Sequence, residues 1–286
     1  MDAIQEQHLE WSITVLDIVL PKAPRDNVVY EIGDVTNLKS VTAIIDRIKP
    51  KVIIHTAGLV PELAGRYGRK LKERVWDINV NGTRNMLSAA KKAGVEAFAA
   101  AEALVLSANT PLLSTCSLRP SVLFGPGDYQ LIPPIHAMIP KRETNFIIGP
   151  GSNLWDVTYA PNIADAHILA VENLLSSSPT AAGEAIFISN EQPITFRDFC
   201  LAVWKEFGHI PKWEVHIPVS VANLAGWVAE WVTWVTGTPT TVSRGSVLDA
   251  VGTRYCSGEK ARRLLGYKPR VGIEEGIRIS CNVSTQ

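Results

Sequence analysis

Short apolar runs alternate with helical segments through the first half of the chain, and this alternation constrains the fold more than any other feature. Apolar runs at 13–18, 28–32 and 51–55 predict β-strands. The run at 51–55 is almost continuously apolar, as expected for a strand buried on both faces of a sheet. Helices are expected at 38–48 and 71–93. Strands that alternate with helices predict an α/β protein with a parallel, doubly wound sheet.

The second half has a different pattern and predicts a smaller lobe. Breaks rich in proline, glycine and serine at 133–134, 150–151 and 176–179 separate its elements. We therefore expect residues 1–185 to form the sheet domain and residues 186–286 to form a substrate-covering lobe with the C-terminal helices. Further strands are predicted at 95–99, 115–124 and 184–189, and further helices at 164–175, 196–207, 219–235 and 259–265.

Composition narrows the class of protein. Lys+Arg and Asp+Glu both number 28, so no global field favours nucleic acid, and we expect no nucleic-acid partner. The four cysteines are far apart, which favours reduced thiols over a disulfide or metal framework. The first ten residues are polar and acidic, unlike a signal peptide. We expect a cytoplasmic location.

Acidic residues at strand ends predict the adenosine side of a dinucleotide site. Asp17 ends the first run, where a carboxylate accepts hydrogen bonds from ribose hydroxyls and disfavours a 2′-phosphate, so NAD is favoured over NADP. A solvent-exposed turn aspartate is an equal alternative. Asp34 and Val35 follow Gly33 after the next run, where a carboxylate can accept from the adenine amino group. The alternative for this stretch is a turn with an Asp N-cap.

The run at 51–55 leads into small residues. Ala57 and Gly58 would let backbone amides approach a pyrophosphate or ribose at the carboxyl edge of the sheet. His55 itself is expected to be a hydrogen-bonded histidine and not a base. Asn79, Asn81 and Gly82 fall in one helical turn at a cost in propensity. An Asn side chain that bonds a neighbouring strand or an active-site water would explain that cost.

The ordered set of motifs resembles the 3β-hydroxysteroid dehydrogenase/isomerase family of extended short-chain dehydrogenases, which includes the sterol-4α-carboxylate 3-dehydrogenases. Each motif is weak alone, but the set spans residues 11 to 279. The motifs are VLDI (15–18), GDV (33–35), HTAG (55–58), NVNGT (79–83), LRPSVLFGPGD (118–128), TYAPNIADAH (158–167) and LGYKPRVGIEEGI (265–277).

The resemblance implies a Rossmann-like fold and NAD-dependent oxidation of a 3β-hydroxyl group on a sterol-like or steroid-like substrate. It also implies roles for matched residues. Asp17 would bind the ribose, Asp34 and Val35 would bind the adenine, and Ala57 and Gly58 would line the phosphates and the nicotinamide ribose. Asn79 would hold the active-site helix against the strand, and Pro120 to Val122 would lie beside the nicotinamide carboxamide. Tyr159 and Asn162 would form the contact between the two lobes.

Two departures from the family pattern stand out. The first glycine is Gly33, so the glycine-rich strand–turn–helix is missing and the sheet is expected to be incomplete at its first strand. In such sheets that strand lies between the second and fourth, so the run at 13–18 would lack a partner on one side. Residues 1–10 are too polar to replace it. NAD binding is expected to be weak, because helix-N-terminus contacts to the pyrophosphate are lost.

The second departure concerns catalysis. In the family a Tyr takes the hydroxyl proton, a Lys four residues later lowers its pKa, and a Ser positions the alcohol. None of the six tyrosines here has Lys at +4, and residues 95–104 fuse a strand directly to a helix. Ser107 lies too deep in that helix to substitute. No catalytic residue is therefore assigned. Two interpretations remain open: a dehydrogenase by family, or a catalytically inactive relative, from a shortened gene model or a diverged copy, that binds without turnover.

A tryptophan-rich helix is predicted at 219–235. Trp227, Trp231 and Trp234 share one face with Leu224. The simplest expectation is a helix of the substrate lobe with this face packed inward. The second is an interfacial helix in peripheral contact with the endoplasmic reticulum membrane. A membrane span is least expected, because polar residues interrupt the run. A homodimer is also left open.

Overall fold

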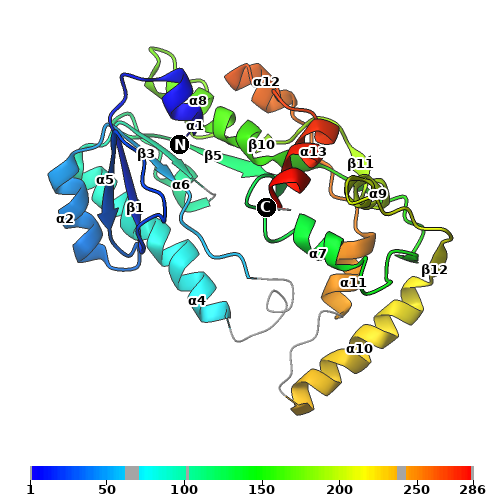
Figure 1. Ribbon diagram of the computed structural model, residues 1–286. Helices are drawn as coiled ribbons and strands as arrows, with labels where there is room; N and C mark the ends of the chain where they lie inside the picture. The colour runs from blue at the N-terminus through cyan, green and yellow to red at the C-terminus, as the bar shows by residue number, and fades with distance from the viewer. Residues whose placement is uncertain (1, 62–70, 101–102, 237–242, 285–286) are drawn as a thin grey trace.

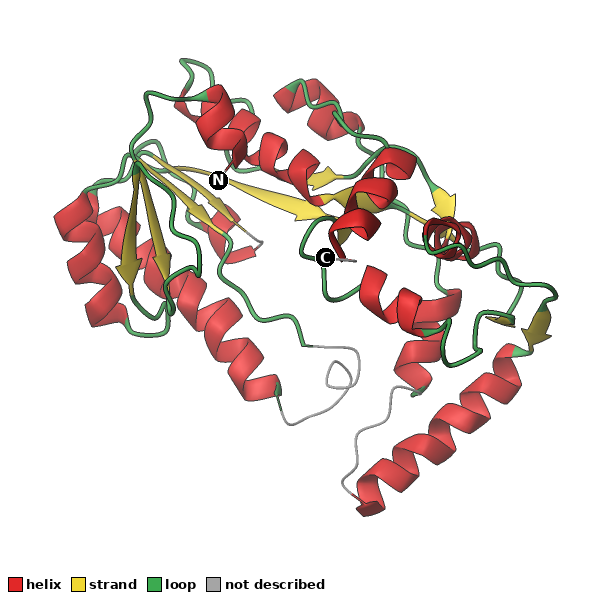
Figure 2. Cartoon of the chain, viewed as in Figure 1, coloured by secondary structure: helices red, strands yellow, loops and turns green. Residues whose placement is uncertain are grey.

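A computed structural model describes residues 2–61, 71–100, 103–236 and 243–284 (Figures 1 and 2). It confirms the α/β fold. A parallel four-stranded sheet has the order β10–β5–β4–β3, and β1 and β2 form a separate parallel pair. The strands are β1 (Ile13–Asp17), β2 (Val28–Ile32), β3 (Val52–His55), β4 (Ala97–Ala100), β5 (Ser114–Pro120) and β10 (Ala185–Ile188).

Helices cover both faces of the sheet. Strand β4 shows this most clearly, because its side chains alternate between two cores. Phe98 lies in the cluster under α2 and α5, while Ala97 and Ala99 lie in the cluster under α8 and α12. The expectation of strands buried on both faces is therefore confirmed for β4. The covering helices are α2 (Leu38–Ile48), α5 (Thr83–Ala93), α8 (Ala160–Leu175) and α12 (Glu259–Leu265).

The predicted gap in the sheet is present. β1 pairs only with β2 among the described residues, and β3 pairs only with β4. Both pairs nevertheless belong to one layer, since Leu16 of β1 and Ile53 of β3 pack against the same core cluster. The expected incompleteness at the first strand position is confirmed.

The predicted helix at 71–93 is divided. It consists of α4 (Lys72–Trp76), a π-helical turn η1 (Asp77–Gly82), and α5, which ends at Gly94 with φ of 72°. The predicted strand at 115–124 is also divided at Ser121. Here the chain leaves the main sheet after β5, and β6 (Val122–Phe124) pairs with β9 (Val157–Tyr159).

The second lobe packs around its own aromatic core. Phe124, Tyr159, Phe199 and Trp204 are fully or almost fully buried there. Its helices are α7 (Ile132–Ala137), α9 (Phe196–Glu206) and α13 (Ile273–Ser284), with α10 (Val219–Thr236) and α11 (Arg244–Val251) beyond them. Its remaining strands are β7 (Phe146–Ile148), β8 (Leu154–Trp155), β11 (Ile194–Thr195) and β12 (Val215–Ile217). The division at residue 185 stays a prediction.

Two short helices complete the described chain. α1 (Asp2–Gln7) lies against α8, where Gln7 Nε2 donates to Asp165 at 2.9 Å. α6 (Ala103–Ser107) lies between β4 and β5 in sequence.

Candidate functional site: a partial nucleotide edge

The η1–α5 segment ties together the loops that follow β2 and β3. Asn85 donates from Nδ2 to the carbonyls of Val35 and Thr36, both at 3.0 Å. Asn79 bonds the backbone of Leu59 twice: its Oδ1 accepts from the N–H at 2.7 Å, and its Nδ2 donates to the carbonyl at 3.0 Å. One helix therefore fixes both strand ends on which the predicted cofactor residues lie.

Close packing at two glycines brings these elements together. A Cβ on Gly82 would lie 2.7 Å from Cγ2 of Val35, which is itself buried. A Cβ on Gly33 would lie 2.8 Å from side-chain carbons of Leu16 and Ile44. At position 82 only glycine fits, because the β-branched Val35 is stiff, whereas at position 33 the obstructing atoms are the ends of flexible side chains. Val35 is thus a packing residue of the loop, and the surface beside it is formed by its exposed neighbours.

The two acidic residues of the predicted adenosine side are exposed at this edge. Asp17 ends β1, and its Oδ1 accepts from the Val19 N–H at 3.3 Å. Asp34 Oδ1 accepts from both the backbone N–H and the hydroxyl of Thr36 at 2.8 Å. Those bonds, the backbone one foremost, lower the pKa of Asp34. Asp34 is therefore a carboxylate at neutral pH, oriented by Thr36.

Ala57 and Gly58 are exposed in the loop after β3, and Gly58 lies beside Asn79. His55, just before them, is only 7% exposed, and its Nε2 lies 3.1 Å from Thr83 Oγ1. Thr83 Oγ1 already donates to the Asn79 carbonyl at 2.7 Å, so it must accept from His55. Burial lowers the pKa of His55 to about 4. His55 is thus a neutral, hydrogen-bonded histidine, as expected.

Pro120 and Val122 lie at the point where the chain passes from β5 to β6. Pro120 is exposed, and Val122 is half-buried. Between them Ser121 bonds the Ile188 carbonyl through its N–H at 3.1 Å, and its hydroxyl lies 2.8 Å from that of Thr158. These bonds hold the crossing from the sheet into the second lobe.

Asn162 joins three segments of the chain. Its Nδ2 donates to Asn190 Oδ1 at 3.0 Å and to the Val271 carbonyl at 2.8 Å, and its Oδ1 accepts from the N–H groups of Arg270 and Val271, both at 3.1 Å. The ring of Tyr159 packs on Phe124, and burial raises the pKa of its hydroxyl. Tyr159 is therefore placed as a core residue and not as a proton acceptor.

The junction after β4 carries no tyrosine–lysine pair. β4 ends at Ala100, α6 begins at Ala103, and residues 101–102 lie outside the described part. The Ser107 hydroxyl donates to the Leu104 carbonyl of its own helix at 2.8 Å. Ser107 is thus engaged locally, in agreement with its exclusion as a catalytic serine.

The tryptophan face of α10 is exposed, so the expectation that it packs inward was wrong. Trp227, Trp231 and Trp234 are 53%, 58% and 82% exposed. The face of α10 that carries small residues contacts the protein instead: a Cβ on Gly226 would lie 2.8 Å from the Arg244 backbone. Glu230 accepts from Arg244 through both carboxylate oxygens, at 2.8 and 3.0 Å. Among the described helices, none is long and apolar enough to cross a membrane.

Comparison with known proteins identifies the family of this chain. The model of the 3-beta hydroxysteroid dehydrogenase/isomerase family matches residues 3–100 and 97–219. The chain belongs to this family. It is 35% identical to the sterol-4-alpha-carboxylate 3-dehydrogenase erg26, decarboxylating, of Schizosaccharomyces pombe, over 86% of this chain and 81% of that protein. It is also 35% identical to ERG26 of Saccharomyces cerevisiae, over 88% and 82%. As a member of this family it is an enzyme by descent.

Solved structures confirm the fold. The Bordetella bronchiseptica enzyme WbmH, solved in complex with NAD+, matches with a TM-score of 0.70 at 13% identity, over 100% of this chain and 93% of that one. The fold is thus Rossmann-like.

The sequence analysis did not predict the roles of three residues of the site: the hydrogen bonds of Thr83 and Asn85, and the close packing of Gly82. Asn85 lies six residues after Asn79, a spacing that does not place both on one face of an α-helix. The two side chains accordingly reach different loops, Asn79 the loop after β3 and Asn85 the loop after β2. The polar cluster Asn-x-Asn-Gly-Thr-x-Asn was the available signal.

Proposed function

We propose that this chain derives from an NAD-dependent dehydrogenase that oxidises the 3β-hydroxyl group of a sterol-like substrate. It has the part of the NAD site that faces the adenosine and it has the substrate lobe, but it lacks the residues that transfer the proton. The family membership and the names of its relatives support the reaction class. None of those names supports an inactive relative. The claim that the proton-transfer residues are missing rests on one observation: β4 ends at Ala100 and α6 already begins at Ala103.

The pattern of matching supports a loss at that point. The family model matches in two stretches that meet at residues 97–100, where β4 ends. The alignment with the S. pombe relative has 282 positions, although it covers only 86% of this 286-residue chain. Some of its positions must therefore hold a residue of the relative opposite a gap in this chain. That relative therefore has residues with no counterpart here.

The residues present fit one half of NAD better than the other. Asp17 and Asp34 offer exposed carboxylates for ribose and adenine, beside Val35. Ala57 and Gly58 would face the phosphates, Asn79 would position their loop, and Pro120 and Val122 would lie on the carboxamide side. Among the described residues no strand pairs between β1 and β3, so no strand–turn–helix at that place offers its helix N-terminus to the pyrophosphate. NAD, when bound, supplies the hydride acceptor.

We assign the exposed face of α10 to a membrane surface. With about 100° per residue, Ala222, Gly226 and Glu230 lie on the protein side, and the large apolar residues lie opposite. Glu230 is the sole charged residue of the helix and is paired with Arg244. Tryptophan favours the headgroup boundary, so this face suits a lipid surface from which a sterol could enter. Location at the endoplasmic reticulum and a homodimer remain predictions.

A chimera tests the reaction. Residues 1–12 and 101–102 are replaced by the corresponding stretches of the S. pombe relative, and NADH formation from a 3β-hydroxysterol is followed. We expect NADH from the chimera and none from the unmodified chain. A folded chimera without NADH formation would refute the reaction, and equal rates for both proteins would refute the claim that proton transfer is missing here.

A further inference from the structure

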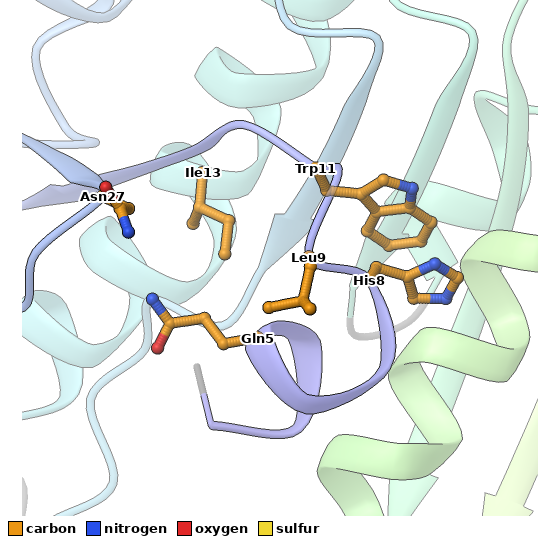
Figure 3. Close-up of a pocket in the computed structure, with 6 residues that line it drawn as sticks. All are labelled: Gln5, His8, Leu9, Trp11, Ile13 and Asn27. Carbon is orange, nitrogen blue, oxygen red and sulfur yellow. The ribbon is translucent and has the colours of Figure 1, made fainter.

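Helix α1 and the turn that follows it join the β1–β2 pair to α8. Arg25, between β1 and β2, donates from Nη1 to Gln5 Oε1 at 3.1 Å. His8 Nε2 lies 2.9 Å from a carboxylate oxygen of Glu172 on α8. Between α1 and β1 lies a cavity of about 260 Å³, and Figure 3 shows its lining residues, Gln5, His8, Leu9, Trp11, Ile13 and Asn27. Because this cavity separates α1 from β1, the attachment of α1 depends on its polar contacts.

The His8 ring lies between two carboxylates. Its Nδ1 is 3.0 Å from Glu10 Oε1, and its Nε2 is 2.9 Å from Glu172 Oε1. A hydrogen bond from its own backbone and one from His8 lower the pKa of Glu10, which keeps this carboxyl group ionised. An ionised carboxylate only accepts hydrogen bonds, so both ring nitrogens of His8 must donate. An imidazole ring with two N–H groups is a cation, and this arrangement therefore requires the protonated ring.

Trp11 stacks on the same ring. The ring centroids of His8 and Trp11 are 3.7 Å apart, their planes differ by 8°, and Figure 3 shows the two rings side by side. The face of an indole ring attracts a cation, so the stacking also favours the protonated ring. The His8 side chain is 17% exposed, which leaves its proton in exchange with solvent.

The other charged groups around α1 are paired with one another. Among the described residues, these pairs are Asp2 with Arg25, Glu6 with Arg270, and Asp165 of α8 with Arg270. In the same part of the chain, His8 is the only cation with which Glu10 or Glu172 pairs. The proton on His8 therefore supplies the charge that offsets these two carboxylates.

We propose that His8, Glu10 and Glu172 form a proton-dependent clasp that holds α1 against α8 and loosens as the pH rises. A neutral imidazole has one N–H group, so it bonds one carboxylate and turns a lone pair toward the other. Histidine ordinarily changes its charge between about pH 5 and pH 8, which places the loosening in the physiological range. Since β1 follows this turn and ends at Asp17, the clasp links pH to the attachment of the strand pair that carries Asp17. The proposal goes beyond the dehydrogenase function and does not depend on it.

Hydrogen exchange of the full chain tests the clasp. The His8 N–H bonds the Ile4 carbonyl at 2.8 Å and closes α1, whose six residues are too few to form a stable helix alone. The measured quantity is the protection of the amides of residues 6–8 relative to their intrinsic exchange rates. We expect protection at about pH 6 to exceed that at about pH 8.5 by roughly two- to fivefold, as for a partly exposed ion pair. Equal protection at the two pH values would overturn the proposal.

Two substitutions separate the clasp from a merely structural contact. Glu172→Gln offers an oxygen to the protonated ring and an N–H to the neutral ring, so protection should become independent of pH and, at about pH 8.5, exceed that of the unmodified chain. His8→Phe keeps a ring against Trp11 but has no donor, so protection should stay at the lower level at both pH values. Glu96→Gln, which removes a surface carboxylate paired with Lys51, is the matched control and should keep the original pH dependence. Persistence of that dependence in Glu172→Gln or in His8→Phe would overturn the proposal.

Discussion

Asn79 and the backbone of Leu59 form a closed pair of hydrogen bonds, with the Asn79 Oδ1 accepting at 2.7 Å and its Nδ2 donating at 3.0 Å. An amide side chain matches a backbone N–H and C=O in this way because it offers both a donor and an acceptor. The pair fixes the loop after β3 to the π-helical turn. The irregular turn therefore positions a loop as well as connecting two helices.

Asn79→Ala should lower the free energy of unfolding by about 1–3 kcal/mol, because two partly buried backbone groups of Leu59 lose their partner. Urea unfolding measures the change. Asn81→Ala is the matched control: among the described residues its side chain bonds Asp77 and Arg84, at the surface, and its effect should stay within about 0.5 kcal/mol. Equal effects of the two substitutions would contradict the role given to Asn79.

Gly82→Ala should also destabilise the protein, since its new Cβ would lie 2.7 Å from Val35 Cγ2. Overpacking of this kind costs about 1–3 kcal/mol, against which the better helix propensity of Ala gains up to about 1 kcal/mol. Val35→Ala in the same protein removes the obstructing methyl groups. The double variant should thus lose less stability than the sum of the single variants, as measured by thermal unfolding; simple additivity would argue against this contact.

The pH dependence of stability should carry a contribution from His55. Burial lowers its pKa from 6.5 to about 4 in the folded protein, so below pH 6.5 the unfolded chain takes up a proton that the folded protein refuses. Stability is therefore lost as the pH falls from about 6.5 to about 4, by up to about 3 kcal/mol. His55→Gln should flatten this part of the profile in urea titrations. An unchanged slope would mean that His55 is protonated in the folded state.

Local signals predicted the first half of the fold well. The bounds of β2 and α2 match their predicted ranges, because α2 has an N-cap at Asn37 and a left-handed residue, Lys49, before Pro50. The gap in the sheet between β1 and β3 also followed from sequence, since the sheet order of this fold places another strand between them. These features depend on residues near one another in the chain.

Features that depend on distant contacts were missed. One is the π-helical turn at Asp77–Gly82, in which Asn79 bonds the backbone of Leu59 in the distant loop after β3. Strands β8 and β11 have only two residues each, too few for a periodic pattern. For α10, periodicity showed an apolar face but not what covers it, and the inward-packed interpretation was wrong because Gly226 and Glu230 provide the contact with the protein.

The exposed face of α10 should bind neutral lipid. We expect the chain to float with neutral liposomes, and the triple variant Trp227→Ser, Trp231→Ser and Trp234→Ser to remain in the dense fraction. Binding should depend little on salt, because the formal net charge is zero and the helix has no basic residue. Trp76→Ser, which removes an exposed tryptophan from α4, is the control and should float normally. Equal flotation of the triple variant and the unmodified chain would exclude a lipid-binding role for this face.

Titration of the unmodified chain with NAD in a calorimeter tests the half-formed nucleotide site most directly. Asp17 and Asp34 remain for the adenosine side, while among the described residues no strand pairs between β1 and β3 to lead into a helix N-terminus at the pyrophosphate. The account predicts no tight binding and little change with Asp17→Ala. A micromolar dissociation constant that Asp17→Ala abolishes would show a complete site and contradict it.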